Sequence, residues 1–264
     1  MKAPSELPVE SYSQHGEDKL LARIFAGKTH GVCVEVGAHD GVGFSNSLLF
    51  EKKGWNCILV EPNPDLCARI KVNRTAQLFE CAASGNNGTA TLKVGGEDYL
   101  STIENDGFAT ERLSSESGEP RTLTVQTRTL DALLEESGLH PIDFVSIDVE
   151  GHEASVLKGF DLARWRPRVL VLENNGDLDE PEVKAITSRA GYRRVFQTGW
   201  LNNWYVHRDD AELNGFLKVL SISGEPLFGE HLVMIAKART PRILFPTART
   251  LWRTLLMLFP AHYG

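Results

Sequence analysis

Short apolar runs alternate with amphipathic segments along most of the chain. Runs typical of strands lie at 32–36, 57–61, 77–82, 143–148 and 168–173. Apolar residues recur with helical spacing at 17–26, 45–53, 64–73, 129–137 and 152–158, and Thr129 and Asp131 suit the start of one of these helices. Because strands alternate with helices, the pattern predicts an α/β protein with a doubly wound, mainly parallel, Rossmann-like sheet.

Two stretches depart from this alternation. Residues 84–128 are rich in Gly, Ser, Thr and Glu, and polar and apolar residues alternate at 89–94 and 122–127. These features predict a hairpin-like insertion after the third strand, at about 85–128. Further strand-like runs at 192–197 and 203–207 predict a final antiparallel pair. We therefore expect a main domain at 31–207, with an N-terminal segment at 1–30 and a C-terminal extension at 208–264.

The composition narrows the class of protein. The 264 residues are 42% hydrophobic and 24% charged, and the net charge is −7. A general nucleic-acid binder needs a basic surface, so that class is excluded. The start of the chain has no apolar core of the signal-peptide type, which favours a cytoplasmic protein. The cysteines are irregularly spaced, and we expect them to be reduced and buried; they are Cys33, Cys57, Cys67 and Cys81.

The first two predicted strands and the turn between them form half of a nucleotide-binding unit. The turn after the first strand allows backbone to approach a ligand closely; it consists of Gly37, Ala38, His39, Asp40 and Gly41. The second strand leads into Glu61, Pro62 and Asn63. We expect Glu61 to accept hydrogen bonds from ribose hydroxyls, with Asn63 assisting. A small turn follows the third strand, on which an adenine ring can lie flat; it consists of Ala82, Ala83 and Ser84.

Two cofactors contain a ribose that could occupy this unit. The GxxxGxG pattern at 37–43 also fits a short-chain dehydrogenase, but none of the 5 tyrosines has the required lysine four residues further on. Glu35 lies inside the first strand, where it suits the cationic amino-acid end of S-adenosylmethionine. A diphosphate would be repelled by the carboxylates of Glu35 and Asp40. The residues therefore favour S-adenosylmethionine over a dinucleotide.

Polar residues also follow the fourth and fifth predicted strands, at the edge where ligands of α/β sheets bind. Asp148, Glu150 and His152 are the candidate catalytic residues, because a hydroxyl acceptor is a poor nucleophile without a base or a metal. Asp148 could also hold the methionine end of the cofactor or cap the next helix. His152 could serve only as a hydrogen-bond partner of the loop, and we expect Glu153 to be a solvated helix residue.

A metal is the second possibility at this edge. Asp148, Glu173 and Asn174 could converge as oxygen ligands of a hard divalent cation such as Mg²⁺. Such a cation would lower the pKa of a bound hydroxyl.

Seven segments of the chain resemble FkbM-type methyltransferases. They are SQHGEDKLL at 13–21, VEVGAHDGVGFSNS at 34–47, VEPNP at 60–64, CAAS at 81–84, TLDALL at 129–134, IDVEGHEASVLKG at 147–159 and LENN at 172–175. The resemblance covers roughly residues 11–207. It implies a class I S-adenosylmethionine-dependent methyltransferase, usually an O-methyltransferase that acts on sugars or natural products.

The resemblance also has implications for individual residues. The segment around Gln14 and Glu17 resembles an element that covers the cofactor, with Gln14 facing the ligand and Glu17 otherwise a first-turn acid of the helix. Asn46 is a candidate to hold the cofactor or its loop. The arrangement of Asp148, Glu173 and Asn174 is similar to the metal site of catechol O-methyltransferases, although Glu173 stands where that family has Asp.

The C-terminal residues 241–260 are basic and very apolar, and they predict an amphipathic helix too short to span a bilayer. Such a helix can dock on its own domain, pair with a second copy, or make peripheral contact with an anionic membrane.

We expect an O-methyltransferase acting on a hydroxyl of a sugar, glycan or glycosylated precursor. The aromatic residues Trp200, Trp204 and Tyr205 could stack on a sugar ring, or pack in the core. The alternatives are a methyltransferase for a natural product or other small molecule, and a catalytically silent module that only binds S-adenosylmethionine.

Overall fold

A computed structural model describes residues 11–95, 101–103, 121–173, 181–198, 202–215 and 232–233. The main sheet has the strand order β12-β10-β11-β9-β8-β1-β2-β3. Five neighbouring strands are parallel: β1 (Val32–Val36), β2 (Asn56–Val60), β3 (Gln77–Phe79), β8 (Phe144–Ile147) and β9 (Val169–Glu173). Next to β9, the strand β11 (Asn202–His207) runs antiparallel to both β9 and β10 (Tyr192–Thr198), and β12 (Leu232–Val233) closes that edge.

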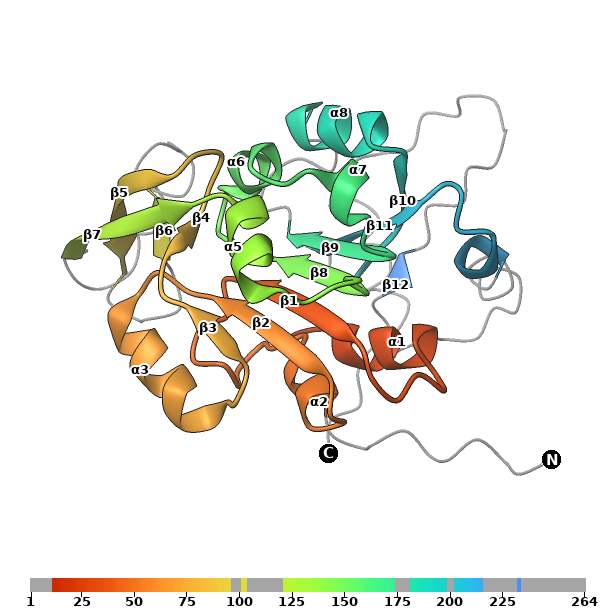
Figure 1. The fold of residues 1–264 in the computed structure, drawn as a ribbon, viewed down its shortest axis with the longest axis horizontal. Coiled ribbons are helices and arrows are strands. Elements are labelled where there is room, and N and C mark those ends of the chain that lie inside the picture. The colour runs from red at the N-terminus through yellow and green to blue at the C-terminus, as the bar shows by residue number, and fades with distance from the viewer. Residues whose placement is uncertain are drawn as a thin grey trace, which may run out of the picture.

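Helices cover both faces of this sheet (Figure 1). One face packs against α5 (Leu130–Ser137), α6 (Glu153–Lys158), α7 (Leu162–Trp165) and α8 (Pro181–Arg189). The other face packs against α1 (Glu17–Ile24) and α2 (Leu48–Glu51). The helix α3 (Pro64–Asn73) lies beside β2 and β3. The prediction of a doubly wound, mainly parallel sheet with an antiparallel last pair is confirmed.

A smaller sheet follows β3. Its order is β4-β7-β5-β6, with β4 (Ala82–Ala83), β5 (Gly88–Val94), β6 (Ser101–Ile103) and β7 (Arg121–Arg128). The antiparallel pairing of β5 with β7 confirms the hairpin predicted from alternation. The prediction of a single strand at 77–82 is wrong. The N–H of Cys81 donates to the carbonyl of Phe79 (3.0 Å), and this turn ends β3. Ala82 and Ala83 then pair with β7 in the second sheet.

Other boundaries also differ from the prediction. The helix expected at 45–53 is shortened to α2, because Ser45, Asn46 and Ser47 hydrogen-bond to Glu35 instead. The short helix α7, the helix α8 and the strand β12 were not predicted. Within the described part of the chain, every helix is too short or too polar to cross a bilayer. The basic helix predicted at 241–260 and the residue Trp200 lie outside the described residues.

Candidate active site

The turns that follow β1 and β8 pack directly against each other. Gly37 has φ of 81°, and a Cβ atom there would lie 1.7 Å from the carbonyl oxygen of Asp148. Its N–H donates to the carbonyl of Val60 at the end of β2 (2.9 Å). The absence of a side chain on this glycine gives room for the backbone of Asp148, and its close approach to a ligand stays a prediction. The carboxyl ends of β1, β2 and β8 therefore form one rigid edge.

Glu61 lies buried at the end of β2. Its carboxylate accepts the N–H groups of His39 (3.0 Å) and Asn63 (2.9 Å). Burial raises the pKa of Glu61 to about 7, and these two N–H groups oppose the rise. The Asn63 side chain caps α3 through Oδ1, which accepts the N–H of Asp65 (3.1 Å), whereas its buried Nδ2 has no hydrogen-bond partner. A carboxylate and, two residues further along the chain, an amide donor without a partner are groups of the kind that bind a vicinal diol.

The rest of the turn after β1 is shaped by Asp40. Its Oδ1 accepts the N–H groups of Val42 and Gly43 (both 2.8 Å). Although partial burial opposes ionisation, these N–H groups and His39 lower the pKa of Asp40. His39 has φ of 51°, and its Nδ1 lies 3.4 Å from Asp40 Oδ1. A direct contact of these residues with a cofactor stays a prediction.

Four further residues of the predicted cofactor site are buried or half-buried. Ala38 is buried against Leu59 and Ile70. Ala82 and Ala83 are buried in β4. Pro62 lies between Glu61 and the cap of α3 and is half-buried. Their roles toward a cofactor also stay predictions.

Glu35 points into the face of the sheet covered by α1 and α2. Its Oε2 accepts from Ser45 Oγ (2.8 Å) and Ser47 Oγ (2.5 Å), and its Oε1 accepts the N–H of Asn46 (2.5 Å). Burial raises the pKa of Glu35, while Arg74 and these hydrogen bonds oppose the rise. Glu35 therefore shapes the loop at 45–47, and a direct contact with the amino-acid end of a cofactor stays a prediction.

Asn46 is held between β1 and β8. Its N–H is bound by Glu35, and its Nδ2 donates to Ser146 Oγ (2.8 Å). Its Oδ1 is buried and has no hydrogen-bond partner. A buried acceptor without a donor is unfavourable. Asn46 Oδ1 can therefore receive a hydrogen bond from a ligand at this edge.

Three carboxyl groups meet at the ends of β8 and β9. Oxygen atoms of Asp148, Glu150 and Glu173 lie within 4.8 Å of one another. Burial raises the pKa of Glu173 well above its usual range, and the neighbouring Asp148 carboxyl, which hydrogen-bonds to it, raises it further. The predicted convergence of Asp148 and Glu173 is thus present, with Glu150 as the third carboxylate. Asn174 lies outside the described residues.

His152 and Ser84 bind each other. The Nε2 atom of His152 lies 3.1 Å from Ser84 Oγ, which lies 3.2 Å from Ser155 Oγ. His152 is 9% exposed. This hydrogen bond joins the turn after β4 to the start of α6, and the role of His152 as a general base stays a prediction.

The expectation that Glu153 is solvated is wrong, since it is 3% exposed. Its Oε1 accepts the N–H groups of Val149 (3.1 Å) and Gly151 (3.2 Å), so its side chain folds back over the start of α6. Burial raises the pKa of Glu153 to about 8, against these hydrogen bonds.

The N-terminal segment reaches the same edge. Glu17 Oε1 accepts from Thr198 Oγ1 (2.5 Å) and Asn202 Nδ2 (2.9 Å), and Asn202 lies opposite Glu173 in the sheet. Glu17 is a first-turn acid of α1, as predicted, and it is fully buried. Gln14, predicted to face a ligand, is exposed. The neighbouring His15 instead has a buried Nε2 atom without a hydrogen-bond partner.

The aromatic residues of β11 belong to the core. Trp204 is fully buried, stacks on Phe196 with ring centroids 4.9 Å apart, and donates from Nε1 to Thr198 Oγ1 (3.1 Å). Tyr205 is also buried. Core packing, the second of their two expected roles, is therefore the one present.

Comparisons with known proteins identify the family of the chain. The model of the methyltransferase FkbM domain matches residues 35–194, more than half of the chain. The 2-O-methyltransferase NoeI of Sinorhizobium fredii is 29% identical over 146 residues, which cover 48% of this chain and 56% of NoeI. The hexuronic acid methyltransferase AglP of Haloferax volcanii is 28% identical over 140 residues, which cover 51% of this chain and 54% of AglP. The chain thus spans about half the length of these two relatives.

Among solved structures, a precorrin-6y C5,15-methyltransferase from Geobacter metallireducens is similar with a TM-score of 0.39 and 12% identity, covering 76% of this chain and 94% of that one. A likeness at this level says nothing about the reaction. The family match over residues 35–194 carries the assignment. The chain belongs to the FkbM methyltransferase family, whose members use S-adenosylmethionine as the methyl donor.

Proposed function

We propose that this methyltransferase transfers the methyl group of S-adenosylmethionine to a hydroxyl of a sugar, glycan or glycosylated precursor. The observation that carries the proposal is the pair of unpaired buried amide atoms at the sheet edge. Asn63 Nδ2 belongs to a residue whose backbone N–H donates to the Glu61 carboxylate, and Asn46 Oδ1 belongs to the loop that follows the turn after β1. They offer a donor for one end of a ligand and an acceptor for the other.

S-adenosylmethionine fits this arrangement of donors and acceptors. Its ribose hydroxyls can donate to Glu61 and accept from Asn63, and its ammonium group can donate to Asn46 Oδ1. When bound, it supplies a methyl group on a positively charged sulfonium. The carboxyl groups of Asp148 and Glu150 lie at the same edge and favour a cationic ligand there.

The acceptor hydroxyl must lose a proton as the methyl group is transferred. Asp148, Glu150 and His152 are the candidates to take that proton; the two carboxyl groups lie together at the sheet edge, and His152 lies against Ser84. The rigid edge formed by Gly37 and the Asp148 carbonyl holds the carboxylates in a fixed position relative to the cofactor loop. Such alignment is a large part of catalysis in a displacement reaction.

A Mg²⁺ ion at Asp148, Glu173 and Asn174 stays a prediction within this proposal. The carboxylate geometry fits a hard cation, but the shared hydrogen bond between Asp148 and Glu173 also satisfies the pair without one. Measuring the rate of methyl transfer with EDTA and with added Mg²⁺ distinguishes a metal-bound site from a hydrogen-bonded carboxyl pair. Activity that survives EDTA would contradict the metal prediction and leave the methyltransferase proposal intact.

The substrate class rests on the two relatives, whose names describe 2-O-methylation and a hexuronic acid. The test is incubation with methyl-labelled S-adenosylmethionine and a panel of acceptors: nucleotide sugars with neutral, amino and uronic acid rings, oligosaccharides, and a catechol. We expect label in a sugar and its loss in Glu61→Gln. Label only in the catechol would favour a small-molecule methyltransferase. Cofactor binding without transfer to any member of the panel would favour a silent binding module.

A further inference from the structure

Arg74 follows the last residue of α3, and its side chain is fully buried. Its Nε donates to Glu51 Oε2 (2.6 Å). Its Nη1 donates to the carbonyl of Gly41 (2.7 Å) and to Ser45 Oγ (3.3 Å), and its Nη2 donates to Ser47 Oγ (2.9 Å). One guanidinium thus binds both ends of the loop at 41–47.

The same loop is bound from its other side by Glu35. Ser45 and Ser47 donate to Glu35 Oε2 and accept from Arg74, and Arg74 Nη1 itself lies 3.9 Å from that oxygen. The planar fork of an arginine can satisfy several acceptors at once, whereas a lysine ammonium cannot reproduce that geometry. Glu35 and Arg74 therefore clamp the loop between two buried opposite charges.

Asn46 lies at the centre of this clamped loop. Its two neighbours in sequence, Ser45 and Ser47, are the residues held by both charges. Its Oδ1 is the unpaired acceptor assigned above to the ammonium end of the cofactor. Arg74 makes no contact at the ribose end, where Glu61 and Asn63 lie at the opposite end of α3.

We infer that Arg74 is a positioning residue for the amino-acid end of S-adenosylmethionine: it fixes Asn46 through the loop at 41–47 without touching the cofactor. This inference rests on the proposed function. It separates the two ends of the cofactor site, because the residues of the ribose end come just before the first residue of α3 and Arg74 comes just after its last.

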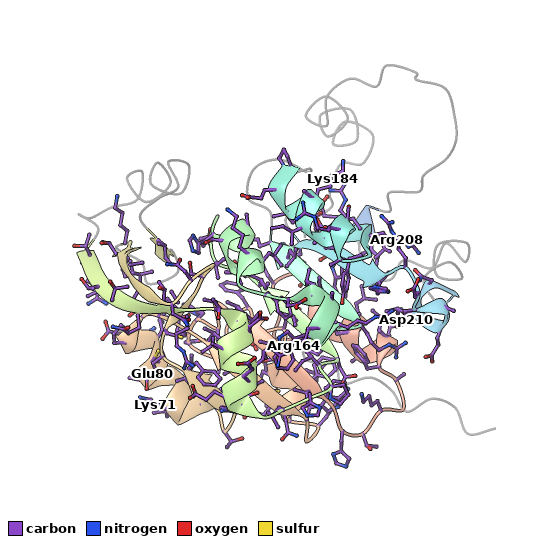
Figure 2. The ribbon with its side chains drawn as sticks, turned by 45° about the horizontal axis from the view of Figure 1, so that its top comes forward. Lys71, Glu80, Arg164, Lys184, Arg208 and Asp210 are labelled. Atoms are coloured by element: carbon purple, nitrogen blue, oxygen red, sulfur yellow. The ribbon has the colours of Figure 1, made fainter. Side chains whose placement is uncertain are left out.

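The test compares two ligands by calorimetry. S-adenosylhomocysteine carries both the ribose and the amino-acid end, and 5′-methylthioadenosine carries only the ribose end. The main variant is Arg74→Lys, which keeps the charge beside Glu35. A second variant, Glu35→Gln with Arg74→Met, removes both charges together, so that no buried carboxylate is left alone. The matched control is Lys71→Met on the same helix, where Lys71 pairs with Glu80 (2.6 Å) on the outer surface (Figure 2).

We expect Arg74→Lys to weaken S-adenosylhomocysteine binding by about tenfold, which corresponds to roughly 1.4 kcal/mol. Binding of 5′-methylthioadenosine should change by less than about twofold. That is much less than the tenfold loss, about 1.4 kcal/mol, expected for S-adenosylhomocysteine. Lys71→Met should bind both ligands as the unchanged protein does. This pattern would support the positioning role.

Two outcomes would overturn it. Unchanged S-adenosylhomocysteine affinity in both Arg74 variants would show that the clamp does not position the ligand. An equal loss for both ligands would indicate a general loosening of the site. Failure of the unchanged protein to bind either ligand would instead overturn the proposed function itself, and the inference with it.

Discussion

Glu61 gives the cofactor site a pH dependence that can be worked out from the structure. Its burial raises the pKa to about 7 in the free protein. Ribose hydroxyls donate hydrogen bonds, so the ionised carboxylate is the form that binds them. With a pKa of 7, about 10% of the groups are ionised at pH 6 and about 90% at pH 8. Ligand affinity should therefore rise by about tenfold between pH 6 and pH 8.

The stability of the free protein depends on pH in the opposite direction to the ligand affinity. Because the pKa of Glu61 is raised from 4.5 to about 7, its contribution is present below pH 4.5 and is lost as the pH rises through 7. Ligand binding draws the group into its ionised form. At pH 7 we expect the release of about half a proton for each ligand bound.

The assay is calorimetric titration with 5′-methylthioadenosine, which lacks the amino and carboxyl groups of the full cofactor. Measurements in two buffers of different ionisation enthalpy give the proton release directly. Glu61→Gln should bind weakly and without a pH slope. Asp65→Asn is the control, because Asp65 is an exposed carboxylate at the start of α3, four residues after Glu61. A slope that persists in Glu61→Gln, or affinity that falls as the pH rises, would refute the reasoning.

Three further predictions follow from single features of the structure. Gly37→Ala should destabilise the protein by about 4 kcal/mol or more in urea unfolding, because its Cβ would overlap the Asp148 carbonyl. Gly54→Ala, with φ of 85° and open space around it, should cost only about 1–2 kcal/mol, and equal losses would contradict the steric argument. Asn46→Ala should weaken S-adenosylhomocysteine by about tenfold and leave 5′-methylthioadenosine unchanged, since only the former has an ammonium group. The four buried cysteines should react with Ellman's reagent only after unfolding, because burial raises the pKa of three of them; rapid labelling of the folded chain would contradict this.

The strand pattern was predictable because its cause is local. The residues at 32–36 and 169–173 are wholly buried as β1 and β9, and Thr129 caps α5 by accepting the N–H of Ala132. The motif acids could also be located, since strand ends are visible in the sequence and parallel strands bring their ends together.

The partners of these acids could not be predicted in the same way. Arg74 joins residues more than twenty positions apart, and the hydrogen bonds of Glu17 reach Thr198 and Asn202. The sequence nevertheless indicated that Glu17 and Arg74 are buried. Glu17 continues the apolar face formed by Leu20, Leu21 and Ile24, and Arg74 follows Ile70 at helical spacing. A charged residue on the apolar stripe of a helix indicates a buried polar contact, but the partner depends on the tertiary fold.

The central claim is that the edge formed by β1, β2 and β8 binds S-adenosylmethionine through Glu61 and Asn46. The most direct measurement is thermal unfolding with S-adenosylhomocysteine, for the unchanged protein and for Glu61→Gln with Asn46→Ala. At about 100 times its dissociation constant, the ligand should add roughly 2.7 kcal/mol of stability to the unchanged protein. We expect a clear rise in Tm for that protein and almost none for the double variant. No rise in the unchanged protein, or an equal rise in both, would contradict the account.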